Sequence, residues 1–165
     1  MKNASINLSE HFTLAELCKT NAGLDNVPNE AQVENLKRLC GWLEMLRRRY
    51  NDKYVVVKGD SSTTLGMTNG GEEPIRINSG YRSPQLNRAI GGAANSNHLT
   101  GCAADIRVAG MEQLIRYATI LLDISDESQE DFYELLLERS PKGNYWLHFA
   151  VRPSGNRRKV RLIQT

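Results

Sequence analysis

Apolar residues recur at three- and four-residue steps in two long stretches of the chain, and this spacing predicts two amphipathic helices. The first stretch runs from Val33 to Tyr50. It follows Asn29, a residue type that caps helices, with Gln32 placed to complete a capping box. The second stretch runs from Met111 to Leu122, and we expect this helix to pack on a sheet and to carry no chemistry.

Local capping signals predict two shorter helices. Thr13 and Glu16 form a capping box, and the pair Ser83–Pro84 is typical of an N-cap followed by the first helical residue. Residues 1–11 are polar, and we expect them to form a flexible arm. Residues 123–131 are acidic, and we expect them to form a mobile connection.

Strands are predicted where apolar and polar residues alternate or β-branched residues cluster. The predicted strands cover residues 54–57, 75–78, 103–108, 132–138 and 145–151, and an edge strand is predicted around 160–163. Between the first two lies a segment rich in Gly, Ser and Thr, residues 59–73. We interpret this segment as a surface insertion, with a lid or specificity loop as the alternative.

Three residues that can bind a metal lie on or beside two of these strands. The alternation places Asp105 opposite the apolar face of its strand, and places His148 away from the more apolar face of another. His98 lies in the turn before Asp105, where Gly101 lets the backbone bend. Two histidines, one carboxylate and a water form the pattern of a catalytic zinc site. Taken singly, each of these residues is more often a structural hydrogen-bonding group.

The three cysteines cannot all pair with one another. Cys18 and Cys40 fall within apolar patterns and are predicted to be small buried side chains. Cys102 lies between His98 and Asp105 in the sequence. A fourth metal ligand and a nucleophile served by His98 are minor alternatives for Cys102, because strand alternation directs it away from Asp105.

Composition restricts the class of protein. A chain of 165 residues with 40% hydrophobic and 24% charged residues can form one folded domain with a core. The net charge of +2 and the lack of a long apolar run predict no nucleic-acid partner and no membrane insertion. We expect a monomer. The N-terminus lacks the apolar core of a signal peptide, which predicts synthesis in a cytoplasm and release by another route.

The stretch 96–105 resembles the signature of the M15 zinc peptidases, the group of D-alanyl-D-alanine carboxypeptidases and phage endolysin peptidases. The matching residues are Ser96, His98, Gly101, Ala103 and Asp105. The resemblance continues upstream in Ser-Gly-Tyr-Arg-Ser-Pro at 79–84 and downstream in Trp-Leu-His at 146–148. Near the N-terminus, residues 12–17 and 25–28 resemble the M15A-like subfamily, in which this domain stands alone.

This resemblance implies a fold and a metal. The implied fold is α+β, a small antiparallel sheet with packed helices as in Hedgehog and D,D-peptidase domains, over a single domain of residues 1–165. The implied cofactor is a zinc ion held by His98, Asp105 and His148. Because each histidine must be neutral to bind, zinc binding is expected to weaken as the pH falls.

The resemblance also implies catalytic residues. Arg82 is expected to hold a substrate carboxylate or a polarised carbonyl, which a planar fork of donors suits. An acidic residue about ten positions before the last histidine is expected to move the proton, and Glu138 fits, with Glu134 as the competitor. Ser96 and Trp146 are expected to line the pocket.

The implied activity is hydrolysis of a peptide bond in the stem or cross-link peptides of bacterial peptidoglycan. The implied setting is a phage or prophage lysin. One alternative is a non-catalytic zinc-containing binding or structural module of the same fold. Another concerns the tail, whose cations are Arg152, Arg157, Arg158, Lys159 and Arg161. We interpret them as the charged outer face of an edge strand, with adhesion to an anionic cell wall or binding of a nucleic acid as alternatives.

Overall fold

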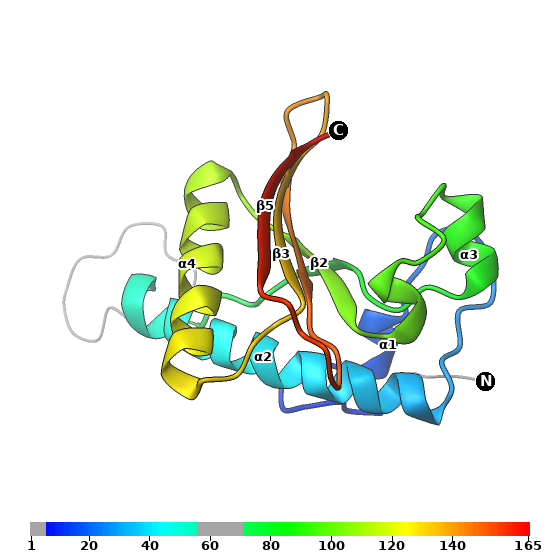
Figure 1. Cartoon of the computed structure of the whole chain (residues 1–165), viewed down its shortest axis with the longest axis horizontal. Helices are drawn as coiled ribbons and strands as arrows, with labels where there is room; N and C mark the ends of the chain where they lie inside the picture. Colours follow the sequence, from blue (N-terminus) through cyan, green and yellow to red (C-terminus); the bar gives the residue numbers. More distant parts are fainter. Residues whose placement is uncertain (1–5, 56–70) are drawn as a thin grey trace.

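The computed structural model describes residues 6–55 and 71–165, which form helices packed around a five-stranded sheet (Figure 1). The helices are α1 (Leu14–Leu17), α2 (Glu30–Tyr54), α3 (Pro84–Ala89), the 3-10 helix η1 (Asn97–Thr100) and α4 (Met111–Ser128). The strands are β1 (Ile77–Ser79), β2 (Ala103–Arg107), β3 (Glu134–Arg139), β4 (Tyr145–Ala150) and β5 (Lys159–Gln164). The predicted combination of helices with a small sheet is therefore confirmed.

The sheet is mixed rather than purely antiparallel. Its strand order is β1-β2-β4-β3-β5, and the pairs are antiparallel except β3 with β5, which is parallel. The predicted antiparallel sheet is wrong for this last pair. The reason lies in how the chain enters β5: the backbone N–H groups of Arg158 and Lys159 donate to the carbonyls of Phe132 and Tyr133, so β5 starts beside the start of β3.

The two faces of the sheet have different characters. One face packs against α2 and α4, and its fully buried residues are Ala104, Ile106, Leu135, Leu147 and Phe149. Trp42 of α2 packs against Phe149 with ring centroids 5.5 Å apart. The opposite face, turned toward α3 in Figure 1, is called the site face here. Its residues are Ala103, Asp105 and Arg107 of β2, Trp146, His148 and Ala150 of β4, Glu134, Leu136 and Glu138 of β3, and Lys159, Arg161 and Ile163 of β5.

Helix α2 begins at its predicted cap and runs past its predicted end. The capping box at Asn29 forms in both directions, with bonds of 2.9 and 2.8 Å. The strand predicted over 54–57 is wrong for Tyr54, the last residue of the helix. The rings of Tyr54 and Tyr50 lie 5.3 Å apart, and Tyr50 meets Tyr117 of α4 edge-on at 4.8 Å. These contacts favour helix over the local preference for strand.

Helix α4 extends through most of the segment predicted as a mobile connection. It ends at Ser128, so residues 123–128 are helical. Ile124 is only 1% exposed and belongs to the core. The acids of this segment lie on the outer side, where Asp126 accepts a bond of 2.6 Å from Arg158. The prediction of a mobile connection fails because it followed the exposed acidic residues of this segment and overlooked Ile124, which lies between them and is buried.

Residues 6–11 pack against the domain, so the predicted flexible arm is wrong for them. Ser9 Oγ donates to a carboxylate oxygen of Glu44 at 2.7 Å, and the backbone N–H of His11 donates to the same oxygen at 2.7 Å. The helix α2 thus supplies an acceptor that local sequence patterns do not reveal. The remainder of the predicted arm, residues 1–5, lies outside the described residues.

Other local predictions have mixed outcomes. The cap at Ser83 is confirmed, because its Oγ accepts from the backbone N–H of Leu86 at 3.2 Å. Cys18, Cys40 and Cys102 are buried and unpaired with one another. Most of the segment 59–73 lies outside the described residues. Within residues 6–55 and 71–165, none of the helices combines the length and the apolar character needed to cross a bilayer.

Candidate metal centre

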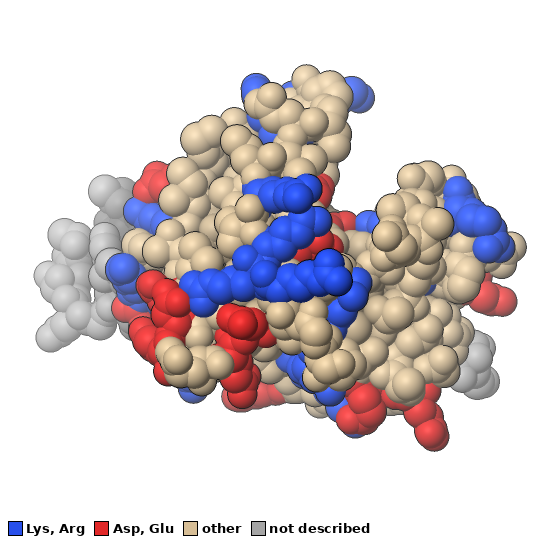
Figure 2. All heavy atoms as spheres, in the orientation of Figure 1, with Lys and Arg blue, Asp and Glu red and all other residues tan. Residues whose placement is uncertain are grey.

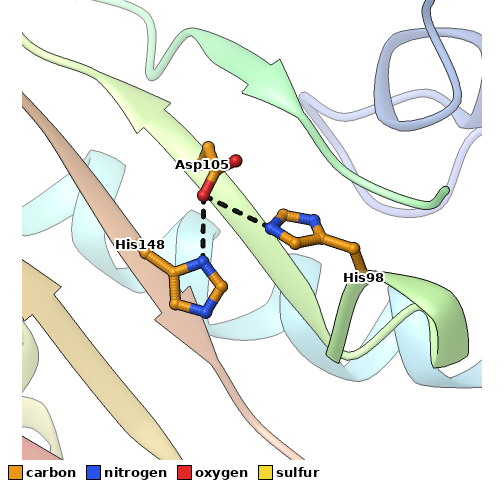
Figure 3. A group of neighbouring side chains, drawn as sticks. All are labelled: His98, Asp105 and His148. Atoms are coloured by element: carbon orange, nitrogen blue, oxygen red, sulfur yellow. Dashed lines mark hydrogen bonds and ion pairs between the residues drawn. The ribbon is translucent and has the colours of Figure 1, made fainter. Parts of the chain in front are cut away.

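Three side chains predicted as metal ligands converge on the site face (Figure 3). Asp105 and His148 are direct partners on the neighbouring strands β2 and β4, so both side chains leave the sheet at the same point. His98 reaches them from η1. Oδ1 of Asp105 lies 2.9 Å from Nδ1 of His148 and 3.3 Å from Nε2 of His98. The sequence placed these residues on suitable faces, and the sheet register brings them together.

His98 is oriented by the backbone around it. The Oγ of Ser96 accepts from the backbone N–H of His98 at 3.3 Å and caps η1. Gly101 ends η1 with a φ of 73°, in the left-handed region that glycine adopts without strain. The Nδ1 of His98 lies 2.6 Å from the carbonyl oxygen of Gly80, which can accept only from a protonated Nδ1. This contact leaves Nε2 as the nitrogen directed at Asp105.

His148 is held on its far side by Glu134. The Nε2 of His148 lies 3.1 Å from Oε1 of Glu134 and is therefore turned away from Asp105. Burial alone would lower the pKa of His148, but its bonds to Asp105 and Glu134 outweigh burial and raise the pKa to about 9. A metal ion at Nδ1 would therefore replace a proton that this site otherwise holds strongly.

Glu134 in turn is held by two further groups. The Nδ2 of Asn97 donates to Oε1 of Glu134 at 2.8 Å, and the Nζ of Lys159 lies 3.4 Å from Oε2. The bond from His148 is the main cause that brings the pKa of Glu134 down to about 2. The Oδ1 of Asn97 accepts from Nε of Arg152 at 2.8 Å, so its amide orientation is fixed from both ends. Both oxygens of the Glu134 carboxylate therefore already have hydrogen-bond partners.

Asp105 uses both of its oxygens. While Oδ1 faces the histidines, Oδ2 accepts from Nη2 of Arg82 at 2.7 Å. The Nε of Arg82 also donates to Oγ of Ser79 at 2.8 Å. Burial alone would raise the pKa of Asp105, but hydrogen bonds from His148 and His98 hold this pKa well below its usual range. The side chain therefore presents a carboxylate, as metal binding requires.

The donor set fits zinc. The candidate ligand atoms of the three residues lie within 4.8 Å of one another. Two imidazole nitrogens and one carboxylate oxygen are typical zinc ligands, and a set of three leaves a fourth position for water or substrate. The second nitrogen of each histidine has its own hydrogen-bond partner, as is usual for metal-binding histidines. Among the described residues, Cys102 is not part of this group.

Three further residues predicted for the site, Glu138, Ser96 and Arg82, have different contacts. Glu138 pairs with Trp146 on the site face, two residues along the strands from the pair of Leu136 and His148. Half-burial is the main cause that raises the pKa of Glu138 above its usual value. Ser96 caps η1, as described above. Arg82 contacts Asp105 directly, closer to the metal ligands than its place at a strand–helix corner suggests.

Two groups that orient the ligands were missed at the level of sequence, the carbonyl of Gly80 and the side chain of Asn97. The contribution of Gly80 comes from its backbone, which no residue pattern can reveal. Asn97 stands directly before His98, but its partners Glu134 and Arg152 are distant in sequence. Nothing short of the tertiary structure links them.

Comparisons with known proteins bear on the family and on the metal. The family model described as Peptidase M15 matches residues 65–122, a range that contains His98 and Asp105 but ends before His148. A zinc D-Ala-D-Ala carboxypeptidase from Streptomyces albus G is 50% identical over 36 residues. This match covers 22% of the present chain and only 14% of the relative. Both similarities imply a zinc ion, and the group of His98, Asp105 and His148 could bind it.

Proposed function

The Peptidase M15 match and the zinc carboxypeptidase relative support an M15 family zinc peptidase, and on this basis we propose that the chain hydrolyses peptide bonds of bacterial peptidoglycan. The proposed substrates are its stem or cross-link peptides. The observation that carries the proposal is the convergence of Nε2 of His98, Oδ1 of Asp105 and Nδ1 of His148. Each ligand is oriented by a further partner, which a chance cluster of polar residues would not require.

These three residues would hold the zinc ion. When bound, zinc acts as a Lewis acid toward the scissile carbonyl and lowers the pKa of water. The ligand residues offer the ion one nitrogen from each imidazole and a carboxylate oxygen, and Nδ1 of His148 would give up its proton as the ion binds. The carbonyl of Gly80 and the carboxylate of Glu134 prevent either imidazole from turning its ligand nitrogen away.

Glu138 is the proposed proton carrier. It would take a proton from the attacking water and deliver it to the leaving amine as the peptide bond breaks. Its half-buried place on the site face raises its pKa toward the range that suits a group exchanging protons near neutral pH. Glu134 is less suited to this task, because its oxygens already accept from His148, Asn97 and Lys159.

Arg82 is proposed to orient the substrate. Its Nη2 is used by Asp105 and its Nε by Ser79, while Nη1 has no hydrogen-bond partner within residues 6–55 and 71–165. That group can donate to a carboxylate or carbonyl oxygen of a peptide placed at the metal centre. Trp146 lies beside Glu138 on the site face and is proposed to form part of the pocket wall.

The proposed biological setting is a phage or prophage lysin that acts on the cell wall. The name of the Streptomyces relative refers to D-Ala-D-Ala, a component of wall peptides, and this is the support for the substrate class. We propose the class of substrate without choosing between removal of a terminal residue and cleavage inside a cross-link.

The test is digestion of purified peptidoglycan, with mass analysis of the released fragments and zinc content measured for each variant. We expect the wild type to release defined peptides, Glu138→Ala to keep zinc but release nothing, and His148→Ala to lose zinc. A wild-type protein that holds zinc and releases nothing from several wall types would instead favour a non-catalytic binding module. Normal cleavage by Glu138→Ala would place the proton carrier elsewhere, with Glu134 as the next candidate.

A further inference from the structure

The last strand brings cations onto the same face of the sheet as the metal centre. The parallel register of β5 with β3 pairs Lys159 with Glu134 and Arg161 with Leu136. Leu136 is also the partner of His148 on its other side. The contact of 3.4 Å between Lys159 and Glu134 shows that these side chains of β5 rise from the site face. Arg161, two residues further along the strand, rises from it as well.

The basic charge around β5 is only partly neutralised. Arg158 is paired with Asp126, and Lys159 approaches Glu134. For Arg161, no carboxylate of the described residues lies within salt-bridge distance, and the residue is exposed. Figure 2 shows Lys and Arg side chains gathered over this part of the molecule, beside a hollow between the sheet and the part that carries α3. An anionic group that enters from the site face would meet a cation with free donors.

We propose that Arg161, assisted by Lys159, is a subsite for a carboxylate of an acidic peptide substrate. This inference rests on the proposed peptidase function. The half-buried Leu136 lies between Arg161 and His148 in the sheet and offers an uncharged surface for the intervening peptide. Arg82 lies on the opposite side of the metal ligands, next to β1 and β2. A peptide that crosses the strands would therefore have an arginine at each side of the metal centre.

The spacing between strands determines how many residues must separate the scissile bond from the carboxylate that Arg161 binds. Neighbouring strands lie about 4.8 Å apart, so Arg161 starts about 10 Å from the strand of His148. An extended peptide advances about 3.3 Å per residue, which places the recognised carboxylate about three residues from the scissile bond. A substrate shorter than this would gain nothing from Arg161.

The experiment compares wild type with Arg161→Gln and with the matched control Arg116→Gln, whose side chain pairs with Glu112 on α4, away from the site face. The probe is purified peptidoglycan, used with its phosphate-containing wall polymers and after their removal. At low ionic strength we expect Arg161→Gln to lower kcat/KM by about three- to tenfold through KM, since exposed charge pairs are worth little and charge-assisted hydrogen bonds more. High salt should remove most of the difference, and Arg116→Gln should match wild type.

The outcomes distinguish a failure of the Arg161 subsite from a failure of the peptidase function. A loss that persists on the polymer-free wall supports a peptide carboxylate as the ligand. A loss seen only with the phosphate polymers, or equal rates for Arg161→Gln and wild type at low ionic strength, overturns the inference and leaves the peptidase function intact. Absence of any release by the wild type overturns both.

Discussion

Two glutamates of β3 lie on either side of the metal centre, and their contacts assign them different tasks. Glu134 bonds to the nitrogen of His148 that faces away from Asp105, while Glu138 pairs with Trp146. We expect Glu134→Gln to weaken zinc binding by about 10- to 100-fold, because loss of a charged partner frees the imidazole and lowers its basicity. The dissociation constant is measured by competition with a chelator.

The matched control is Glu138→Gln, which should bind zinc as the wild type does and lose hydrolysis. The reverse pattern, with normal zinc binding by Glu134→Gln and loss of activity only in that variant, would exchange the two assignments. Because the two residues share a strand and a face, a general effect on the sheet would alter both variants alike.

The element η1 depends on a glycine that holds it against α2. A Cβ at Gly101 would lie 2.6 Å from the carbonyl oxygen of Gln32, and the φ of 73° disfavours other residues. We expect Gly101→Ala to lower the free energy of unfolding by about 2 to 4 kcal/mol through strain and overpacking. Denaturant unfolding measures it. Gly41→Ala, at an open position within α2, should instead raise stability by up to about 1 kcal/mol.

The N-terminal segment is tied to α2 by a charge. Burial would raise the pKa of Glu44, but hydrogen bonds from Ser9 and His11 outweigh it and lower the pKa below the unfolded value of 4.5. A lowered folded pKa stabilises the fold above the unfolded pKa, and this stabilisation is lost as the pH falls through the folded pKa. We therefore expect Glu44→Gln to be less stable than wild type near neutral pH, with a difference that shrinks below about pH 4.5.

Unfolding curves measured across this pH range test the prediction. Glu34→Gln is the control, since Glu34 is exposed on the same helix and bonds only to Lys37 among the described residues. A stability difference for Glu44→Gln that stays constant with pH would show that the carboxylate charge is not responsible.

For the molecule as a whole, zinc should act as a stabilising ligand. The three ligands come from η1, β2 and β4, so the ion binds a site that the unfolded chain lacks. At a free zinc concentration of about 100 times the dissociation constant, the gain is about 2.7 kcal/mol, or a rise in Tm of roughly 5 to 10 °C. Thermal unfolding with added zinc and with a chelator measures this shift, and His148→Ala should show none.

The local sequence of this protein carries the information for its caps, faces and ligand types. The box at Asn29, the cap at Ser83 and the alternation that directs Asp105 and His148 to one face were all predictable, because each depends on neighbours within a few residues. The same patterns failed where distant contacts compete. Tyr54 stays helical beside Tyr50, which meets Tyr117 of α4, and the last turns of α4 are helical as well.

Contacts between residues that are distant in the chain could not be predicted from the sequence and became known only from the tertiary structure. The parallel entry of β5, the carbonyl of Gly80 behind His98 and the bond from Glu134 to His148 depend on strand order and register. Sequence periodicity assigns a side chain to a face but does not state which strand lies beside it. The types of the metal ligands can thus be predicted from the sequence, whereas their orientation and the separate tasks of Glu134 and Glu138 depend on long-range strand pairing.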